Sequence, residues 1–233
     1  MRVAIVIPVY NHEQRLEAVI SDCLELGLPV FVVDDGCTDR TPAILEQCGE
    51  ISVLRHLKNQ GKGAALLTGF AAAARTCDWA ITLDADGQQH PADAKELITA
   101  VPNTMRPIII GARQGMDTEN VPWTSRFGRG FSNFWVWISG GPWVSDSQSG
   151  FRLYPLPEVL QLPVEARRFQ FEVEVLVKAR QQGIPILEIP VRVVYQVEGG
   201  RISHFRPFID FCRNSATFAR LITSRIFAGV FRK

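Results

Sequence analysis

The chain has 233 residues, a hydrophobic content of 46% and a net charge of +1, which suit one large domain with a buried core. Its five cysteines are scattered without a Cys-x-x-Cys pair, which argues against a zinc knuckle or a disulfide scaffold and favours a reducing compartment. No run of about 18 apolar residues is present, so we expect no membrane-spanning helix, and we interpret the short apolar start as a strand rather than a signal peptide.

Short apolar runs alternate with helical patterns through the first 113 residues. Strands are expected at residues 3–9, 30–33, 51–54, 80–84 and 108–111, with helices at about 12–26 and 41–49, a helix that follows a loop at 59–63 and runs to about Arg75, and a further helix from Pro91. Such alternation at short spacing is typical of parallel sheets with helices on both faces. The sequence therefore predicts a doubly wound, mostly parallel α/β sheet.

The pattern becomes less regular after Arg113. We expect a helix over 126–139, a short strand over 149–154, a helix over 169–182, an extended strand over 186–195 and a long helix over 207–231. The last helix repeats aromatic and aliphatic residues at close to 3.6-residue spacing, so we expect it to be amphipathic.

Charge is distributed unevenly along the chain. Residues 201–233 carry seven lysines and arginines and one acid, whereas residues 1–200 carry 18 basic and 23 acidic residues. A basic, aromatic tail on an acidic body favours an anionic partner surface, with a membrane as the first candidate. Packing of the same aromatic stripe onto the rest of the protein is the alternative.

Candidate ligand-binding residues lie at the ends of four predicted strands, at the edge where ligands bind in open α/β sheets. They are Pro8 with Tyr10, Asp34 with Asp35, Asp84 with Asp86, and Arg113. Two acids one residue apart can hold a hard divalent cation, which in turn can neutralise a phosphate group. Taken alone, Asp84 and Asp86 also fit a solvated acidic turn, and Asp34 and Asp35 fit a helix cap.

The Gly61-Lys62-Gly63 loop precedes an alanine-rich helix. It lacks the full P-loop pattern, and no Gly-x-Gly-x-x-Gly follows the first strand, which disfavours a dinucleotide site. The loop could still direct backbone N–H groups or Lys62 at a phosphate. A plain tight turn before a helix explains it equally well.

Six segments occur in an order that resembles the family 2 glycosyltransferases of the GT-A fold, close to the dolichyl- and polyprenyl-phosphate mannose and glucose synthases. The segments are PVYNHE, VVDDGCTDRT, NQGKGAALLTGF, LDADGQQHP, TSRFGRGFSNF and DSQSGFR. The resemblance implies a Rossmann-like GT-A domain over residues 1–205, followed by a basic amphipathic helix over 206–233. Within the domain, residues 1–113 would bind the donor and residues 114–205 would form the acceptor side.

The resemblance also implies a site for a UDP- or GDP-sugar. Its residues would be Pro8, Tyr10, Glu13, Val33, Asp35, Lys62, Asp84, Ala85, Asp86 and Arg113. Asp86 and Gln88 would bind Mg²⁺ or Mn²⁺ at the diphosphate, and Arg201 would stabilise the leaving charge. Glu13 departs from the family pattern because His12 intervenes after Asn11. Whether His90 is a metal ligand or a first-turn helix residue stays open.

The acceptor side is implied in the same way. Its residues would be Arg126, Arg129, Gly150, Arg152, Ser203 and His204. A hydroxyl acceptor needs a general base, for which Asp146 is the first candidate and Glu172 or Glu174 the second. A lipid phosphate is already an anion, needs no base, and would be steered by arginines.

Together with these residues, the resemblance implies a metal-dependent, inverting glycosyltransferase that moves a sugar from a nucleotide diphosphate sugar to a lipid-linked or glycan acceptor. We expect a cytoplasmic protein at the inner face of a membrane, acting in cell-envelope glycan synthesis, with no nucleic-acid partner. A sugar nucleotidyltransferase is one alternative, although the glycine-rich signature of such enzymes is missing after the first strand. A non-catalytic, membrane-associated nucleotide-sugar-binding module is the other.

Overall fold

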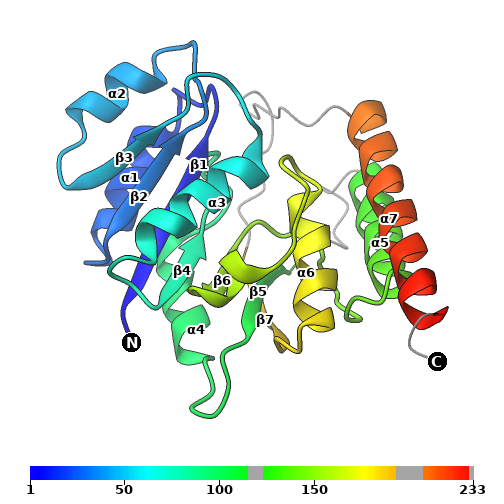
Figure 1. The fold of residues 1–233 in the computed structure, drawn as a ribbon. Helices are drawn as coiled ribbons and strands as arrows, with labels where there is room; N and C mark the ends of the chain where they lie inside the picture. The colour runs from blue at the N-terminus through cyan, green and yellow to red at the C-terminus, as the bar shows by residue number, and fades with distance from the viewer. Residues whose placement is uncertain (115–122, 193–206, 231–233) are drawn as a thin grey trace.

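The computed structural model describes residues 1–114, 123–192 and 207–230. Within these residues seven strands form one sheet, in the order β3-β2-β1-β4-β6-β5-β7. Figure 1 shows this sheet running through the middle of the molecule with helices on both sides. The strands are β1 (Val3–Val9), β2 (Val30–Asp34), β3 (Ile51–Arg55), β4 (Trp79–Thr82), β5 (Ile108–Arg113), β6 (Arg152–Pro155) and β7 (Ile186–Val191).

Strand β6 is the one antiparallel member of this sheet. It lies between β4 and β5 and runs opposite to both, whereas β5 pairs with β7 in parallel. The remaining pairs, β1 with β2, β1 with β4 and β2 with β3, are parallel. The predicted doubly wound, mostly parallel sheet is therefore confirmed. The reversal of β6 was not predicted, because strand direction depends on the connection before the strand and not on its own pattern.

Successive side chains of β1 point to opposite faces of the sheet and pack in two separate cores. Ile5 and Ile7 are buried with Leu16 on one face of the sheet. Val6 is buried with Phe70 on the other face. Because helices cover both faces, β1 is apolar along nearly its whole length, as parallel strands are when neither face meets water.

The helices divide between the two faces. One face is covered by α1 (Leu16–Leu24), α2 (Thr41–Gln47) and α4 (Ala94–Thr99). The other is covered by α3 (Lys62–Ala73) and α6 (Phe171–Gln181), and α6 in turn contacts α5 (Trp123–Ile138) and α7 (Pro207–Val230). Figure 1 shows α5 and α7 side by side at the edge of the molecule away from β3. Short 3-10 turns at Pro91–Asp93 and Glu158–Gln161 complete the described helical structure.

The first helix begins later than its pattern predicts. We expected it from residue 12, but it starts at Leu16. The backbone N–H of Glu13 donates to Asp39 Oδ2 at 3.2 Å, and Glu13 Oε2 accepts from the Arg40 N–H at 2.8 Å. These bonds tie the chain after β1 to the loop after β2, so the helix starts only beyond them.

The predicted C-terminal helix is present as α7, but a clean separation into an apolar and a polar face is not confirmed. Its inner side buries Phe218 and Leu221, and Arg220 Nη2 lies 2.7 Å from Oε1 of buried Glu174 in α6. Its outer side also carries apolar groups, among them Phe227, which is 58% exposed. None of the helices in the described ranges combines the length and the apolar character that a bilayer crossing requires.

Candidate active site

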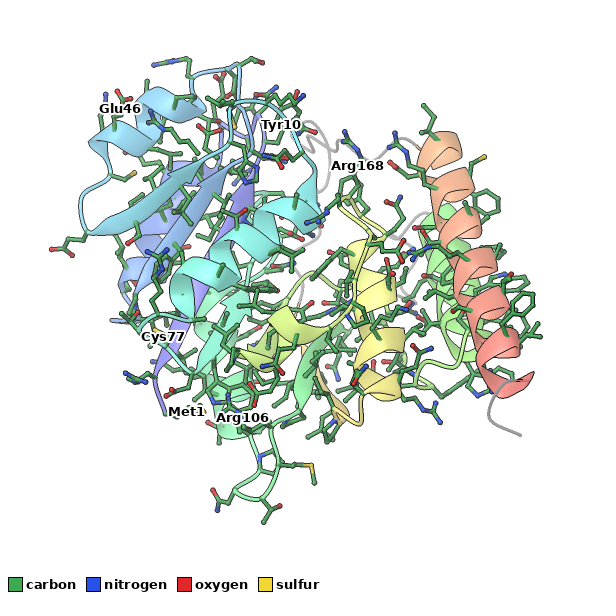
Figure 2. All side chains as sticks on the ribbon, viewed as in Figure 1. Met1, Tyr10, Glu46, Cys77, Arg106 and Arg168 are labelled. Carbon is green, nitrogen blue, oxygen red and sulfur yellow. The ribbon has the colours of Figure 1, made fainter. Side chains whose placement is uncertain are left out.

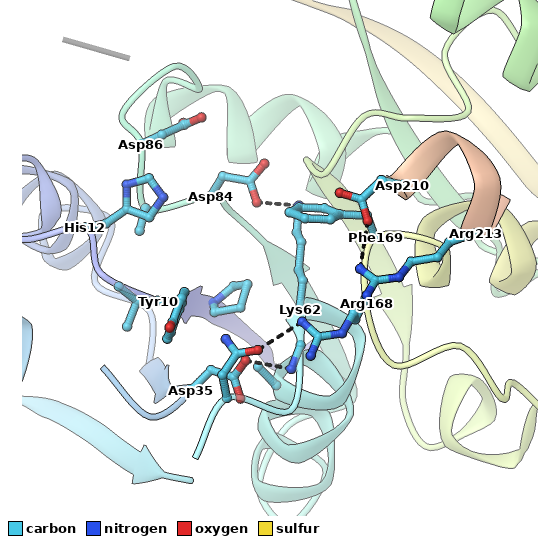
Figure 3. Close-up of a pocket in the computed structure, with 16 residues that line it drawn as sticks. Tyr10, His12, Asp35, Lys62, Asp84, Asp86, Arg168, Phe169, Asp210 and Arg213 are labelled. Carbon is cyan, nitrogen blue, oxygen red and sulfur yellow. Dashed lines mark hydrogen bonds and ion pairs between the residues drawn. The ribbon is translucent and has the colours of Figure 1, made fainter. Parts of the chain in front are cut away.

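A cleft of about 530 Å³ opens at the carboxyl ends of the strands (Figure 3). Val9 of β1 pairs with Asp34 of β2, so the residues that follow them, Tyr10 and Asp35, leave the sheet side by side. Because β4 pairs with the other side of β1, the acids after β4 reach the same edge. The predicted donor-site residues that line the cleft together are Pro8, Tyr10, Asp35, Lys62, Asp84, Ala85 and Asp86.

Residues from both halves of the chain meet at this edge. Figure 2 shows Tyr10, at the end of β1, and Arg168, from the segment before α6, at the same end of the molecule. Met1 and Arg106 lie at the opposite end. The cleft is therefore built between the sheet edge and segments that follow β6.

Asp35 is held in the cleft wall by three donors. Its Oδ1 accepts from the Gln60 N–H at 2.8 Å and from His56 Nδ1 at 2.7 Å, and its Oδ2 accepts from the Gly61 N–H at 2.7 Å. The other ring nitrogen of His56 lies 2.9 Å from Thr68 Oγ1, so we assign the hydroxyl as donor to Nε2 and Nδ1–H as donor to Asp35. Since a carboxylate has about four acceptor sites, Asp35 retains capacity for a ligand donor.

Lys62 lies between two carboxylates. Its Nζ is 2.6 Å from Asp84 Oδ1 and 2.6 Å from Glu172 Oε1. Burial opposes the charged lysine, but the two carboxylates outweigh it and hold the pKa of Lys62 above its usual value. Burial also opposes ionised Asp84, but the charge and hydrogen bond of Lys62 lower the pKa of Asp84. Gly150 packs against this pair, since a Cβ there would lie 2.6 Å from Asp84 Oδ2.

The turn after β4 presents two carboxylates to the cleft. The Gln89 side chain fixes Asp84, because its Oε1 accepts from the Asp84 N–H at 2.9 Å and its Nε2 donates to Asp84 Oδ2 at 3.1 Å. The backbone N–H of Gln88 donates to Asp86 Oδ1 at 3.0 Å. Gly87 allows the turn with φ +70°. Gln89 thus contacts Asp84 through its side chain, whereas Gln88 is seen to act on Asp86 through its backbone.

This acidic pair fits a divalent cation that shares its coordination with a phosphate ligand. Mg²⁺ usually takes one or two carboxylates and fills its other positions with substrate phosphate oxygens and water. Asp84 and Asp86 offer that donor set, and over the ranges that the structure describes no three His, Cys, Asp or Glu side chains gather into a fuller cage. His90 instead accepts a hydrogen bond from the Ala92 N–H at 3.4 Å and caps the 3-10 turn.

The glycines of the Gly61-Lys62-Gly63 loop are explained by close packing with the segment before α6. A Cβ on Gly61 would lie 2.5 Å from Arg168 Cγ, and a Cβ on Gly63 would lie 2.6 Å from Phe171 Cβ. The sequence had left the loop open between a phosphate-binding loop and a plain turn. The structure shows a third use, in which the small residues let a distant segment dock on the start of α3.

Replacing Gly63 with alanine is expected to lower the free energy of unfolding by about 1–3 kcal/mol, because the new methyl group would overlap Phe171 Cβ and the nearby Ala166 carbonyl. Urea denaturation measures this change. Gly49→Ala is the matched control, since a Cβ at Gly49 would meet no atom within 4 Å, and it should change the stability by less than about 0.5 kcal/mol. Equal stability of Gly63→Ala and wild type would contradict the packing argument.

Asp146, the first candidate for a general base, is buried in an ion pair. Arg113 Nε donates to Asp146 Oδ2 at 2.7 Å, and Arg113 Nη2 donates to Asp146 Oδ1 at 2.9 Å. The Arg113 backbone N–H also points at Oδ2, at 3.2 Å. Neither residue is among the described residues that line the cleft. The pair joins the end of β5 to the loop before β6.

The second candidates for a base are also paired. Glu172 lies beside Lys62, as described above. Glu174 Oε1 lies 2.7 Å from Arg220 Nη2, and its Oε2 accepts from the Ala166 N–H at 2.9 Å. Each carboxylate that the sequence offered as a base therefore has a cationic partner.

Arg152, predicted on the acceptor side, is fully buried and organises the turn before β6. Its Nε donates to Ser149 O at 2.7 Å, its Nη2 to Ser147 O at 2.7 Å, and its Nη1 to the Glu172 carbonyl at 2.8 Å. These bonds hold the turn as a loop, so the strand expected from residue 149 begins only at Arg152.

The other predicted site residues fall into two groups. Three lie outside the described cleft wall: Glu13, bound to the loop after β2; Val33, buried within β2; and Arg129, on α5. The side chain of Arg126 and the whole of Arg201, Ser203 and His204 lie outside the described residues.

The cleft also contains residues that the sequence did not assign to it. The polar and aromatic ones are His12, Asn59, Arg168, Phe169, Asp210 and Arg213. The first two stand next to predicted motifs, and that adjacency was a usable signal. The other four come from the segment before α6 and from the first turns of α7, whose local sequence carries no sign of a site at the sheet edge.

The chain matches the family model described as Glycosyl transferase family 2 over residues 4–155. That range contains the strand-end residues of the cleft. It ends before Arg168 and before the α7 residues that complete the cleft wall.

Named relatives and a solved structure agree with this match. The chain is 29% identical over 213 residues to the UDP-N-acetylglucosamine–dolichyl-phosphate N-acetylglucosaminyltransferase of Methanococcus voltae, covering 82% of this chain and 85% of that protein. It is 28% identical over 244 residues to the dolichyl-phosphate beta-glucosyltransferase of Drosophila melanogaster, covering 92% and 73%. The glucosyl-3-phosphoglycerate synthase of M. tuberculosis superposes with a TM-score of 0.71 at 20% identity, over 96% of this chain and 80% of that one, which shows a shared fold.

Proposed function

The chain belongs to glycosyltransferase family 2, and from this premise we propose that it transfers a sugar from a nucleotide diphosphate sugar to a polyprenyl or dolichyl phosphate. The names of the two relatives support a lipid-phosphate acceptor. We choose a phosphate acceptor over a hydroxyl acceptor because Asp146, Glu172 and Glu174 each form an ion pair with a lysine or arginine side chain. Family membership also favours sugar transfer over the sugar nucleotidyltransferase alternative.

In this proposal the donor nucleotide lies against Pro8, Tyr10 and Asp35. The proline and the aromatic ring offer apolar contact to a base, and the remaining acceptor capacity of Asp35 suits an N–H or O–H group of the base or ribose. Uracil and guanine both carry such N–H groups. The proposal therefore covers UDP-sugars and GDP-sugars.

A divalent cation, Mg²⁺ or Mn²⁺, would be held by Asp86 first, since Asp84 Oδ1 already lies 2.6 Å from Lys62 Nζ. When bound, such a cation neutralises charge on the departing diphosphate. The protein's own contribution at this point is the turn after β4, in which Gln88 and Gln89 orient the two carboxylates. These bonds fix the acids before a ligand arrives.

The proposed acceptor class follows from the ion pairs that the candidate general bases make. A hydroxyl acceptor loses its proton as it attacks and needs a general base within reach. Asp146, Glu172 and Glu174 each lie within 2.7 Å of a cationic group, and none of the three is among the described residues that line the cleft. A phosphate acceptor is already anionic. One of its oxygens would bond to the anomeric carbon as the bond to the donor diphosphate breaks, which inverts that carbon.

The outer surface around α5 and α7 supports contact with a membrane. Trp137 and Trp143 meet edge to face and are 46% and 70% exposed, and Phe227 is exposed on α7. Arg180 and Arg225 line a hollow beside Trp137. Exposed aromatic side chains with neighbouring arginines suit the interface of a bilayer that carries anionic headgroups. A lipid acceptor would be reached from such a surface.

The test uses purified protein with Mg²⁺, a panel of UDP- and GDP-sugars, and two acceptors of the same chain length, polyprenyl phosphate and polyprenol, in anionic vesicles. Mass spectrometry is expected to show one sugar added to polyprenyl phosphate and none added to polyprenol. A product on polyprenol alone would overturn the acceptor class. Formation of nucleotide sugar from a sugar phosphate and a nucleoside triphosphate would identify a nucleotidyltransferase instead.

A further inference from the structure

Arg168 brings a guanidinium into the cleft from the segment before α6. Its Nη1 donates to Asn59 Oδ1 at 3.0 Å. Its stem crosses Gly61, where an added Cβ would come within 2.5 Å of Arg168 Cγ. The preceding carbonyl, Arg167 O, accepts from the Ala64 N–H in the first turn of α3 at 2.9 Å. The backbone at Arg167 and the stem of Arg168 therefore pack on the start of α3, and one bond to Asn59 orients the exposed guanidinium at the cleft.

Arg168 differs from the other cations of the cleft in its partner. Lys62 contacts two carboxylates, and Arg213 Nη1 lies 3.1 Å from Asp210 Oδ1. Arg168 instead bonds to a neutral amide, and within the described part of the chain no carboxylate lies within ion-pair distance of it. Its positive charge is therefore available to an anionic ligand.

The position of Arg168 in the cleft wall allows it to meet a phosphate group of a bound ligand. Figure 3 shows Arg168 and Arg213 on one side of the pocket and His12 and Asp86 on the other. A guanidinium has five N–H donors, so one bond to Asn59 leaves several for the oxygens of a phosphate, whose geometry they match.

We propose that Arg168 binds an oxygen of a substrate phosphate group in this cleft. The inference rests on the proposed function, in which two substrates carry this chemistry: the donor as a diphosphate and the lipid acceptor as a monophosphate. Arg168 lies beyond residue 155, where the family match ends.

The experiment compares wild type with Arg168→Gln, Arg168→Lys and Arg167→Gln. Arg167 is the matched control, because it is an exposed neighbouring arginine that is not among the described residues lining the cleft. Isothermal titration calorimetry with Mg²⁺ present measures the affinity of each protein for UDP, for GDP and for a short-chain isoprenyl phosphate. Thermal melting checks that all four proteins are folded.

Arg168→Gln is expected to weaken the affinity for one of these ligands about 10- to 100-fold, as the loss of a charge-assisted hydrogen bond does. Arg168→Lys should lose less, because it keeps the charge, and Arg167→Gln should match wild type. Weaker binding of UDP or GDP assigns Arg168 to the donor diphosphate, and weaker binding of isoprenyl phosphate assigns it to the acceptor.

Affinities of Arg168→Gln within twofold of wild type for all three ligands would overturn the inference, as would an equal loss in Arg167→Gln. These measurements do not depend on turnover. Failure of the wild-type protein to glycosylate polyprenyl phosphate would therefore contradict the proposed function, whereas the binding comparison decides the role of Arg168 separately.

Discussion

Replacing Lys62 with methionine is expected to lower the free energy of unfolding by about 3–5 kcal/mol at pH 7, because removing one partner of a buried ion pair leaves uncompensated charge. The side chains of Lys62, Asp84 and Glu172 are only 15%, 27% and 9% exposed, so water compensates little of the loss. Urea denaturation followed by circular dichroism measures the change. Lys58→Met is the control, because Lys58 is exposed, and it should change the stability by less than about 0.5 kcal/mol.

The pH dependence of stability tests whether the ion pairs of Lys62 cause this loss of stability. The pKa of Asp84 is lowered in the folded protein, so its contribution is present above the unfolded pKa of about 3.9 and is lost as the pH falls through the folded pKa. The pKa of Lys62 is raised, so its contribution is present below the unfolded pKa of about 10.4 and is lost as the pH rises through the folded pKa.

In Lys62→Met the effect of acid on the Asp84 contribution to stability is expected to reverse. Burial would raise the pKa of the Asp84 carboxyl once Lys62 no longer stabilises its charge, so protonation of Asp84 should favour the folded variant. The stability difference from wild type is therefore expected to shrink as the pH falls from 7 to about 4. A difference of the same size at both pH values would contradict the ion-pair explanation.

Replacing Asp86 with alanine is expected to lower kcat/KM for sugar transfer about 10²- to 10³-fold, because stabilisation of the leaving diphosphate by a bound cation is worth several kcal/mol. The variant should also lose the increase in UDP or GDP affinity that Mg²⁺ gives the wild type. Steady-state kinetics measures the first effect, and calorimetry with and without Mg²⁺ measures the second.

Asp22→Ala provides the control, since Asp22 is an exposed acid on α1 and should behave as wild type in both measurements. An Asp86→Ala protein that is folded and keeps both its turnover and its Mg²⁺-dependent nucleotide affinity would show that the turn after β4 is not the cation site.

The strand-end part of the site was predictable from local pattern. Apolar runs that end abruptly in Tyr10, Asp35 and Asp84 predict parallel strands, and parallel strands bring their carboxyl ends to one edge. His12 and Asn59 stood beside these motifs and were missed for lack of a chemical signature of their own.

The pairing of the charged residues was not predictable in the same way. Asp146 was a reasonable base from its motif, yet Arg113 neutralises it from the end of β5. Lys62 was a reasonable phosphate ligand, yet Glu172, which is 110 residues away in sequence, reaches it from α6. A side chain's partner depends on which distant element packs beside it, and local sequence does not report that.

The amino-acid sequence by itself determined the alternating strands and helices, the edge of the sheet at which the cleft lies, and the acidic turn at that edge, because each depends on periodicity or on neighbouring residues. Only the tertiary structure decided the reversed direction of β6, the burial of Arg152, and the arrival of Arg168 and Arg213 at the far wall of the cleft. These features depend on contacts between segments far apart in the chain, which form only when the two cores pack.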